Sequence, residues 1–167
     1  SSRYCTGRID YRGAQVSLDD LETWMGTERD PGRLEEMWTK WHAVATPMAG
    51  DYARMVEIAN EGARDLGYPN VGDYWLSNYD MPPAEMEREV ERLWGQMQPF
   101  YEQLHCYTRA RLNARYGDAV QGLEQPIRAD LLGNMWAQEW GNIADIVVPQ
   151  TRAPSFDLTQ LLVRQNY

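Results

Sequence analysis

The feature that most constrains this chain is the recurrence of apolar residues every three or four positions, in runs bounded by helix-capping residues. The longest run extends from Met86 to Leu112 and closes at Tyr116-Gly117. Such spacing places apolar side chains on one face of a helix. We find no alternating strand of useful length and no internal repeat, so the sequence predicts an all-α fold.

Capping residues and prolines set the expected helix boundaries. Ser17 and Asp20 form a capping-box pattern for a short helix that ends near Gly26. Asp30-Pro31 opens a second helix, which is broken around Thr46-Pro47. The further helices expected are 52–67, 73–79, 86–116 with a kink at Pro99, 130–149, and one that begins at Asp157. Most of the tryptophans lie on the apolar faces and are expected in the core: Trp38, Trp41, Trp75, Trp94, Trp136 and Trp140.

Composition limits the classes of partner. The 167 residues carry 16 basic and 25 acidic side chains, a net charge of −9, which argues against nucleic acid or an anionic membrane surface. No stretch approaches the roughly 18 consecutive apolar residues of a membrane-spanning helix. Two cysteines, Cys5 and Cys106, are too few for a disulfide scaffold. Lys40 is the only lysine, and this arginine bias indicates GC-rich coding and a bacterial source.

Motifs for the common catalytic centres are missing from the sequence. His42 and His105 are its only histidines and no H-E-x-x-H occurs, so these residues predict no metal site within the chain. A nucleophile elbow, a dinucleotide-binding glycine motif and a P-loop are also absent. Cys106 follows His105 directly, but neighbouring residues on a helix do not face each other, which favours a buried, inert thiol.

The segment Asp130 to Trp140 carries the remaining chemical signal. On the expected helix Asn134 and Gln138 share a face, because they are four residues apart, and Trp136 and Trp140 share another. Side-chain amides can fix a ligand carboxylate by donating hydrogen bonds. Taken alone, the segment fits a solvated polar face better than a ligand site.

Together with other segments, this region resembles the angiotensin-converting-enzyme-like peptidyl-dipeptidases, the M2 zinc metallopeptidases. The resemblance covers about residues 15 to 160. The similar segments are L-L-G-N-M-W-A-Q-E-W at 131–140, W-T-K-W-H at 38–42, V-E-I-A-N-E at 56–61, G-D-Y-W at 72–75, Y-D-M-P-P at 79–83, E-R-L-W at 91–94, Q-P-F-Y at 98–101 and L-H-C-Y at 104–107. The forms Y-D-M-P-P and L-H-C-Y look most like bacterial members.

The resemblance implies a helical ellipsoid with a deep central substrate channel, of which residues 1–167 are an internal, N-terminal-half portion. Such enzymes release C-terminal dipeptides from oligopeptides, use zinc and are often modulated by chloride. In the family the H-E-x-x-H motif and the third zinc ligand lie C-terminal to the part that this chain resembles. We therefore expect zinc ligands and general base outside the chain, no catalytic residue within it, and a periplasmic or secreted location.

The resemblance also implies roles for individual residues. Gln138 matches the glutamine that holds the substrate's terminal carboxylate, with Asn134 and Glu139 beside that pocket. Asp19 aligns less securely with an acidic residue of a substrate side-chain pocket. Tyr79 matches a chloride-binding tyrosine.

Other positions depart from the family pattern or match only its packing. His42 stands where the family has the arginine of a second chloride site, which puts that site in doubt. Cys5 matches a half-cystine whose partner region lacks a cysteine, so no disulfide is expected there. Trp75 and Trp136 match packing positions.

Two function classes stay open. In the first, the chain is one portion of a zinc dipeptidyl carboxypeptidase, and its partners are oligopeptide substrates and the remaining part of the peptidase domain. In the second, it is a non-catalytic helical binding module that keeps the fold without the zinc half. We favour the first.

Overall fold

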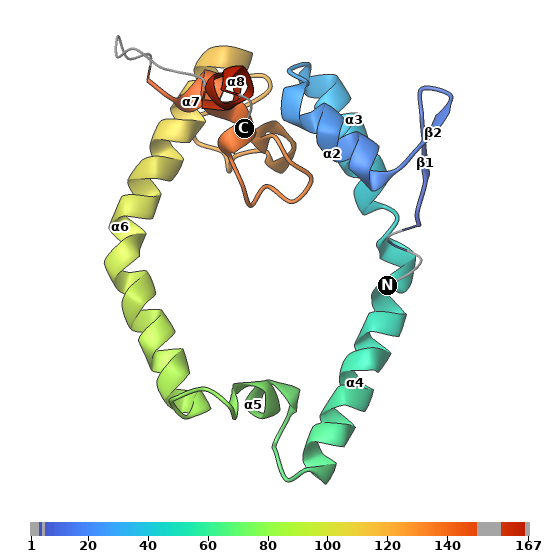
Figure 1. Ribbon diagram of the computed structural model, residues 1–167, viewed down its shortest axis with the longest axis vertical. Helices are drawn as coiled ribbons and strands as arrows, with labels where there is room; N and C mark the ends of the chain where they lie inside the picture. The colour runs from blue at the N-terminus through green and yellow to red at the C-terminus, as the bar shows by residue number, and fades with distance from the viewer. Residues whose placement is uncertain (1–3, 5, 150–157, 166–167) are drawn as a thin grey trace.

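The computed structural model describes residue 4 and residues 6–149 and 158–165, and it is mostly helical (Figure 1). The elements, in chain order, are β1 Ile9–Tyr11, β2 Ala14–Val16, α2 Leu18–Thr27, α3 Pro31–His42, the 3-10 turn η1 Thr46–Met48, α4 Ala49–Asp65, α5 Val71–Leu76, α6 Pro83–Tyr116, the 3-10 turns η2 Ala129–Leu132 and η3 Gly141–Ile143, α7 Ala144–Val147 and α8 Leu158–Arg164. The all-α prediction is confirmed, with one short hairpin added.

The predicted capping residues begin the helices. The Ser17 side chain accepts a hydrogen bond from the Asp20 backbone N–H at 3.2 Å, and the Asp20 carboxylate accepts one from the Ser17 N–H at 2.9 Å. The Asp30 carboxylate caps α3 by accepting from the Arg33 N–H at 2.8 Å. The predicted helix starting at Asp157 corresponds to α8, although Asp157 itself lies outside the described residues.

The hairpin β1–β2 is an element that the sequence analysis missed. Ile9 pairs with Val16 and Tyr11 with Ala14 across a two-residue turn. The turn residues Arg12 and Gly13 both have positive φ, 53° and 84°, as required by the tight turns that match strand twist. Each strand has only three residues, too few to give an alternating pattern.

The core lies at one end of the molecule, where the hairpin, α2 and α3 meet the C-terminal part of α6 and the segment from η2 to α7 (Figure 1). Its largest fully buried side chains include Trp41, Leu21, Met25, Leu34, Met37, Leu112, Leu131, Met135 and Ile143. Burial of this apolar surface is the main stabilising contribution.

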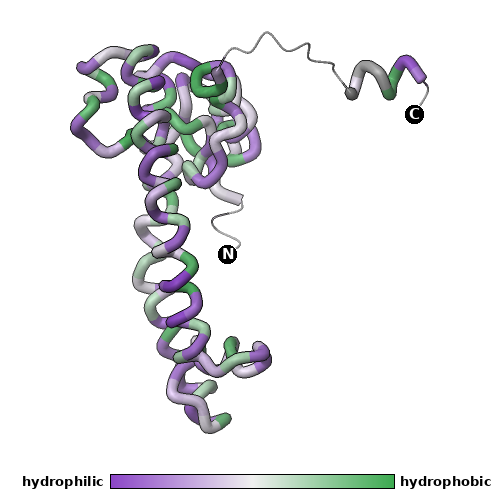
Figure 2. Tube along the Cα trace, turned by 90° about the vertical axis from the view of Figure 1, so that its left-hand side faces the viewer, coloured by the Kyte–Doolittle hydropathy of each residue, from purple (hydrophilic) through white to green (hydrophobic). Residues whose placement is uncertain are grey.

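Away from this core, α4, α5 and the N-terminal part of α6 form an open arch (Figure 1). Hydrophobic residues recur along this arch, as Figure 2 shows. Many of them are exposed, among them Tyr52, Met55, Ile58, Val90, Leu93, Met97 and Phe100. The expectation of core packing is therefore wrong for Trp75, Trp94 and Trp136, which are 69%, 46% and 45% exposed. No described element covers the helix faces that carry Trp75 and Trp94 or the loop that carries Trp136. Among residues 4, 6–149 and 158–165, none of the helices has the length and apolar character of a membrane span.

The prediction of a continuous helix over 130–149 is wrong. The segment instead consists of η2, an irregular loop, η3 and the single turn of α7. Gly133 and Ala137 adopt positive φ, 83° and 57°, which a right-handed helix cannot contain. The apolar residues that suggested a helix, such as Leu132 and Met135, are nevertheless buried, because the loop folds back onto the core.

Candidate functional site

The loop that follows η2 carries Gln138 and is fixed at its start by an ion-pair network. Arg128 donates to both carboxylate oxygens of the buried Asp130, at 3.1 and 2.6 Å, and also to Glu35 on α3 at 3.0 Å. The hydrogen bond and charge of Asp130 raise the pKa of the Arg128 guanidinium, against an opposing effect of burial. The network joins the beginning of the loop to α3.

Asn134 maintains the shape of the loop. Its Oδ1 accepts a hydrogen bond from the Trp136 backbone N–H at 2.9 Å, and its Nδ2 donates to the Glu139 carbonyl at 3.0 Å. Asn142 closes the other side by donating from Nδ2 to the Gly133 carbonyl at 2.9 Å. Because the segment from Gly133 to Trp140 is not helical, the prediction that Asn134 and Gln138 form one helical amide face is wrong.

Gln138 and Glu139 are the loop's free polar side chains. Both are exposed, and neither side chain hydrogen-bonds to any described residue. A glutamine amide offers two N–H donors and a carbonyl acceptor, so Gln138 can receive a carboxylate without first losing an internal partner. The structure therefore leaves Gln138 available for a ligand through a loop geometry that the sequence analysis did not expect.

An aromatic row leads from this loop along the exposed face of α6. The Trp140 indole N–H donates to the Ala137 carbonyl at 3.0 Å, and its ring meets His105 edge to face, with ring centroids 5.4 Å apart. His105 in turn contacts Tyr101 at 5.1 Å, and Tyr101 contacts Trp94 at 5.5 Å. The row was missed, although the spacing of 94, 101 and 105 on one helix was a usable signal.

The position of Asp19 is set by α2. It lies exposed in the first turn of α2, whereas Gly26, at the other end of α2, packs against Asn142. Seven residues of helix separate these positions, about 10 Å along the axis. Burial raises the pKa of the neighbouring Glu22 carboxyl, and the Asp19 charge adds to this effect.

Tyr79 and His42, the expected chloride-site residues, lie apart. Tyr79 follows α5 at the far end of the arch and is exposed (Figure 1). His42 ends α3, where its ring stacks on Trp38 at 3.9 Å and its Nδ1 lies 2.7 Å from the Trp38 carbonyl. Tyr79 and His42 therefore lie on separate elements, one beyond α5 and the other at the end of α3.

The residues that the structure describes do not fit a zinc ion. Within the described ranges, no three His, Cys, Asp or Glu side chains gather as a metal site. His42 lies on α3 and His105 on α6. Cys106 is a free thiol and is exposed, so the expectation of a buried thiol is wrong; Cys5 lies outside the described residues.

Comparison with known proteins agrees with the resemblance drawn from the sequence motifs. The family model described as Peptidase M2, angiotensin-converting enzyme, matches residues 1–167. Angiotensin-converting enzyme of Oryctolagus cuniculus is 38% identical over 172 residues, covering 100% of this chain and 13% of that protein. The Bos taurus enzyme is 42% identical over 149 residues, with 89% of this chain and 11% of the relative covered.

The angiotensin-converting enzyme of Theromyzon tessulatum is 38% identical over 169 residues, which is 100% of this chain and 27% of the relative. The chain thus spans between about a tenth and about a quarter of the length of these relatives. The match over the full chain and the identities above one third, together with the helical fold, show that this chain belongs to the M2 peptidase family.

Proposed function

We propose that this chain is a portion of a zinc dipeptidyl carboxypeptidase that releases C-terminal dipeptides from oligopeptides, and that Gln138 holds the terminal carboxylate of the substrate. The observation that carries the proposal is the exposed, unpartnered amide of Gln138, within a segment of a chain that matches the M2 family throughout. Glu139 lies beside the carboxylate pocket, and Asp19 contributes to a substrate side-chain pocket.

The rigidity of the loop supports a binding role for Gln138. Asn134, Asn142 and the Arg128–Asp130 pair fix the backbone on both sides of it before any ligand arrives. A preformed site loses less conformational entropy on binding than a mobile loop does. In this proposal Asn134 therefore contributes by positioning the backbone around Gln138.

Zinc and its general base belong, in this proposal, to sequence outside the 167 residues, because the described residues offer no fitting ligand set. Zinc would supply Lewis acidity to the peptide carbonyl when bound. Chloride is proposed at Tyr79. Histidine at position 42 is a weaker anion partner than the family's arginine, which is permanently charged and offers five donors.

The decisive experiment uses the complete enzyme and compares Gln138→Ala with wild type on two peptides that differ only in a C-terminal acid or amide. An amide-to-carboxylate hydrogen bond contributes about 1.5 to 3 kcal/mol, so its loss should weaken free-acid binding by about one to two powers of ten. The change should appear mainly in KM, if the contact is equal in ground and transition states.

Gln103→Ala is the matched control, since Gln103 is also exposed and lies on α6. It should leave the acid-to-amide preference unchanged. An unchanged preference in Gln138→Ala would remove Gln138 from the carboxylate site.

Intact mass combined with metal analysis tests the alternative function. A purified protein with neither a further half nor zinc would be the non-catalytic helical binding module.

A further inference from the structure

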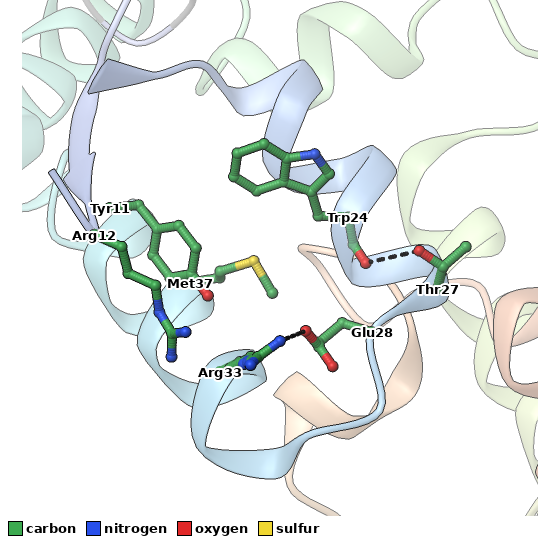
Figure 3. A pocket seen from close by; sticks show the side chains of 7 residues that line it. All are labelled: Tyr11, Arg12, Trp24, Thr27, Glu28, Arg33 and Met37. Atoms are coloured by element: carbon green, nitrogen blue, oxygen red, sulfur yellow. Dashed lines mark hydrogen bonds and ion pairs between the residues drawn. The ribbon is translucent and has the colours of Figure 1, made fainter. Parts of the chain in front are cut away.

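A separate pocket lies between the hairpin and the helices α2 and α3 (Figure 3). Its volume is about 400 Å³, and the residues that line it are Tyr11, Arg12, Trp24, Thr27, Glu28, Arg33 and Met37. None of these residues has a part in the proposed peptidase chemistry. The volume suits one small organic molecule.

Aromatic and apolar groups form one part of the lining. The Tyr11 and Trp24 rings approach at a tilt, with centroids 5.9 Å apart, and the Met37 side chain lies between the two in Figure 3. Tyr11 and Met37 are buried, whereas Trp24 is 40% exposed and offers ring surface to a ligand. A flat aromatic group can pack on the exposed Trp24 ring, while Tyr11 and Met37 form the buried wall behind it.

Two arginines lie on the other side of the pocket (Figure 3). Arg12 Nε is 3.6 Å from Glu36, and Arg33 Nη1 is 3.3 Å from Glu28. These partners use only part of the five N–H donors of each guanidinium, so donors remain for a carboxylate. Both arginine side chains are about half exposed, which keeps the donors accessible.

Glu28 sets one negative charge against the two arginines of the lining. Its Oε1 accepts hydrogen bonds from the Arg29 and Asp30 backbone N–H groups, at 2.8 and 2.9 Å. These two bonds, with smaller contributions from Arg33, hold the pKa of the Glu28 carboxyl below its usual value. With two arginines and one glutamate the lining carries a net charge of +1, in a chain whose net charge is −9.

The turn that presents Arg12 has a conformational cost. Arg12 occupies a position with φ 53°, where glycine or asparagine is favoured and other residues are strained. Its guanidinium carbon lies 5.4 Å from the centre of the Tyr11 ring, which keeps the group over the pocket wall. A strained backbone position that delivers a charged group to a pocket is a pointer to function.

We propose that this pocket binds a small aromatic carboxylate, with its ring against Trp24 and its carboxylate shared by Arg12 and Arg33. The site is distinct from the Gln138 loop and does not depend on the proposed peptidase function. N-acetyl-L-phenylalanine is a suitable probe, and its Kd should be on the order of 1 mM, given its small size.

Arg12→Asn is the most informative variant, because asparagine suits the turn and removes the guanidinium. It should weaken the binding of N-acetyl-L-phenylalanine about ten-fold or more, while the melting temperature stays equal or rises. Arg33→Gln should weaken binding to a similar extent. Arg88→Asn, an exposed position on α6 away from the pocket, makes the same change in net charge and should leave the affinity unchanged.

The experiment is isothermal titration of the purified protein, repeated with N-acetyl-L-phenylalaninamide and N-acetyl-L-alanine. The amide should bind at least ten-fold more weakly if the arginines hold the carboxylate, and the alanine derivative more weakly if the aromatic rings contribute. Binding must persist in Gln138→Ala, which separates this pocket from the substrate-carboxylate site. Equal affinities of wild type and Arg12→Asn, or loss of binding in Gln138→Ala, would overturn the proposal.

Discussion

Replacing Gly133 by alanine should be among the most destabilising single-methyl additions in this chain. Gly133 has φ 83° and ψ 4°, a left-handed conformation that costs a residue with a Cβ about 1 to 2 kcal/mol. A Cβ built there would lie 2.9 Å from the Asn142 Cβ and 3.2 Å from the Ile143 Cγ2. Ile143 is buried in the core and cannot move away freely.

The two effects add. Overpacking a closely filled site costs about 1 to 3 kcal/mol, so Gly133→Ala should lose about 2 to 5 kcal/mol of unfolding free energy in total. Gly13→Ala is the matched control, since Gly13 has nearly the same φ, 84°, but nothing within 4 Å of the added Cβ. Gly13→Ala therefore carries the conformational cost without the steric clash.

Urea denaturation of both variants and wild type, followed by circular dichroism, measures the difference. The loss in Gly133→Ala should exceed the loss in Gly13→Ala by at least about 1 kcal/mol. Because the Gly133 loop carries Gln138, the complete enzyme should also lose part of its preference for free-acid peptides. Equal losses in the two variants would refute the steric argument and show that the loop accommodates the methyl group.

Three further outcomes are expected. Asp130→Ala should lower the free energy of unfolding, measured by urea denaturation, by about 2 to 3 kcal/mol, because it leaves the partly buried Arg128 without its closest partner. Glu35→Ala removes an exposed partner of Arg128 and should lower it by under about 1 kcal/mol. Hydrogen bonds within the capping box lower the pKa of the Asp20 carboxyl. The ionised carboxylate therefore stabilises the fold above the unfolded pKa near 3.8, and this stabilisation is lost as the pH falls through the folded pKa. In Asp20→Asn, the melting temperature should depend less steeply on pH in that range. The 167 residues expressed alone should bind a hydrophobic dye through the exposed α6 face, and Phe100→Gln should reduce the dye fluorescence without changing the helix content.

Local signals in the sequence were enough for the helices before residue 117. A side-chain cap at Ser17, a proline in the first turn at Pro31 and a left-handed glycine at Gly67 are each satisfied by residues close in sequence. Such signals need no knowledge of the tertiary structure. The boundaries of α2, α3, α4 and α6 follow them to within a few residues.

The loop between η2 and α7 could not be predicted in the same way. Its buried residues Leu132, Met135 and Ile143 are spaced as on a helix, but they are buried because an irregular chain folds against the core. The glycine at 133 was a signal against a helix, while the left-handed conformation of Ala137 had none, because a positive φ is uncommon for alanine. The availability of Gln138 therefore needed the structure, whereas its proposed role came from the family resemblance.

The tryptophans show a related limit. Helical periodicity correctly placed Trp94 on an apolar face, but a periodic pattern does not say which element covers that face. Trp41 is fully buried because α3 packs within the core, and Trp75 is exposed because α5 lies out on the arch.

The length of α6 gives the arch a mechanical property. Its C-terminal part is anchored where the Tyr107 hydroxyl donates to the Val147 carbonyl at 2.9 Å, the Arg111 Nε donates to the Ile146 carbonyl at 3.0 Å, and Leu112 is fully buried. From this anchor to Pro83 the helix is about 40 Å long, at about 1.5 Å per residue. A tilt of about 5° at the anchor displaces the Pro83 end by about 4 Å, simply from the length of the lever. Small changes in packing around Leu112 are therefore amplified at α5.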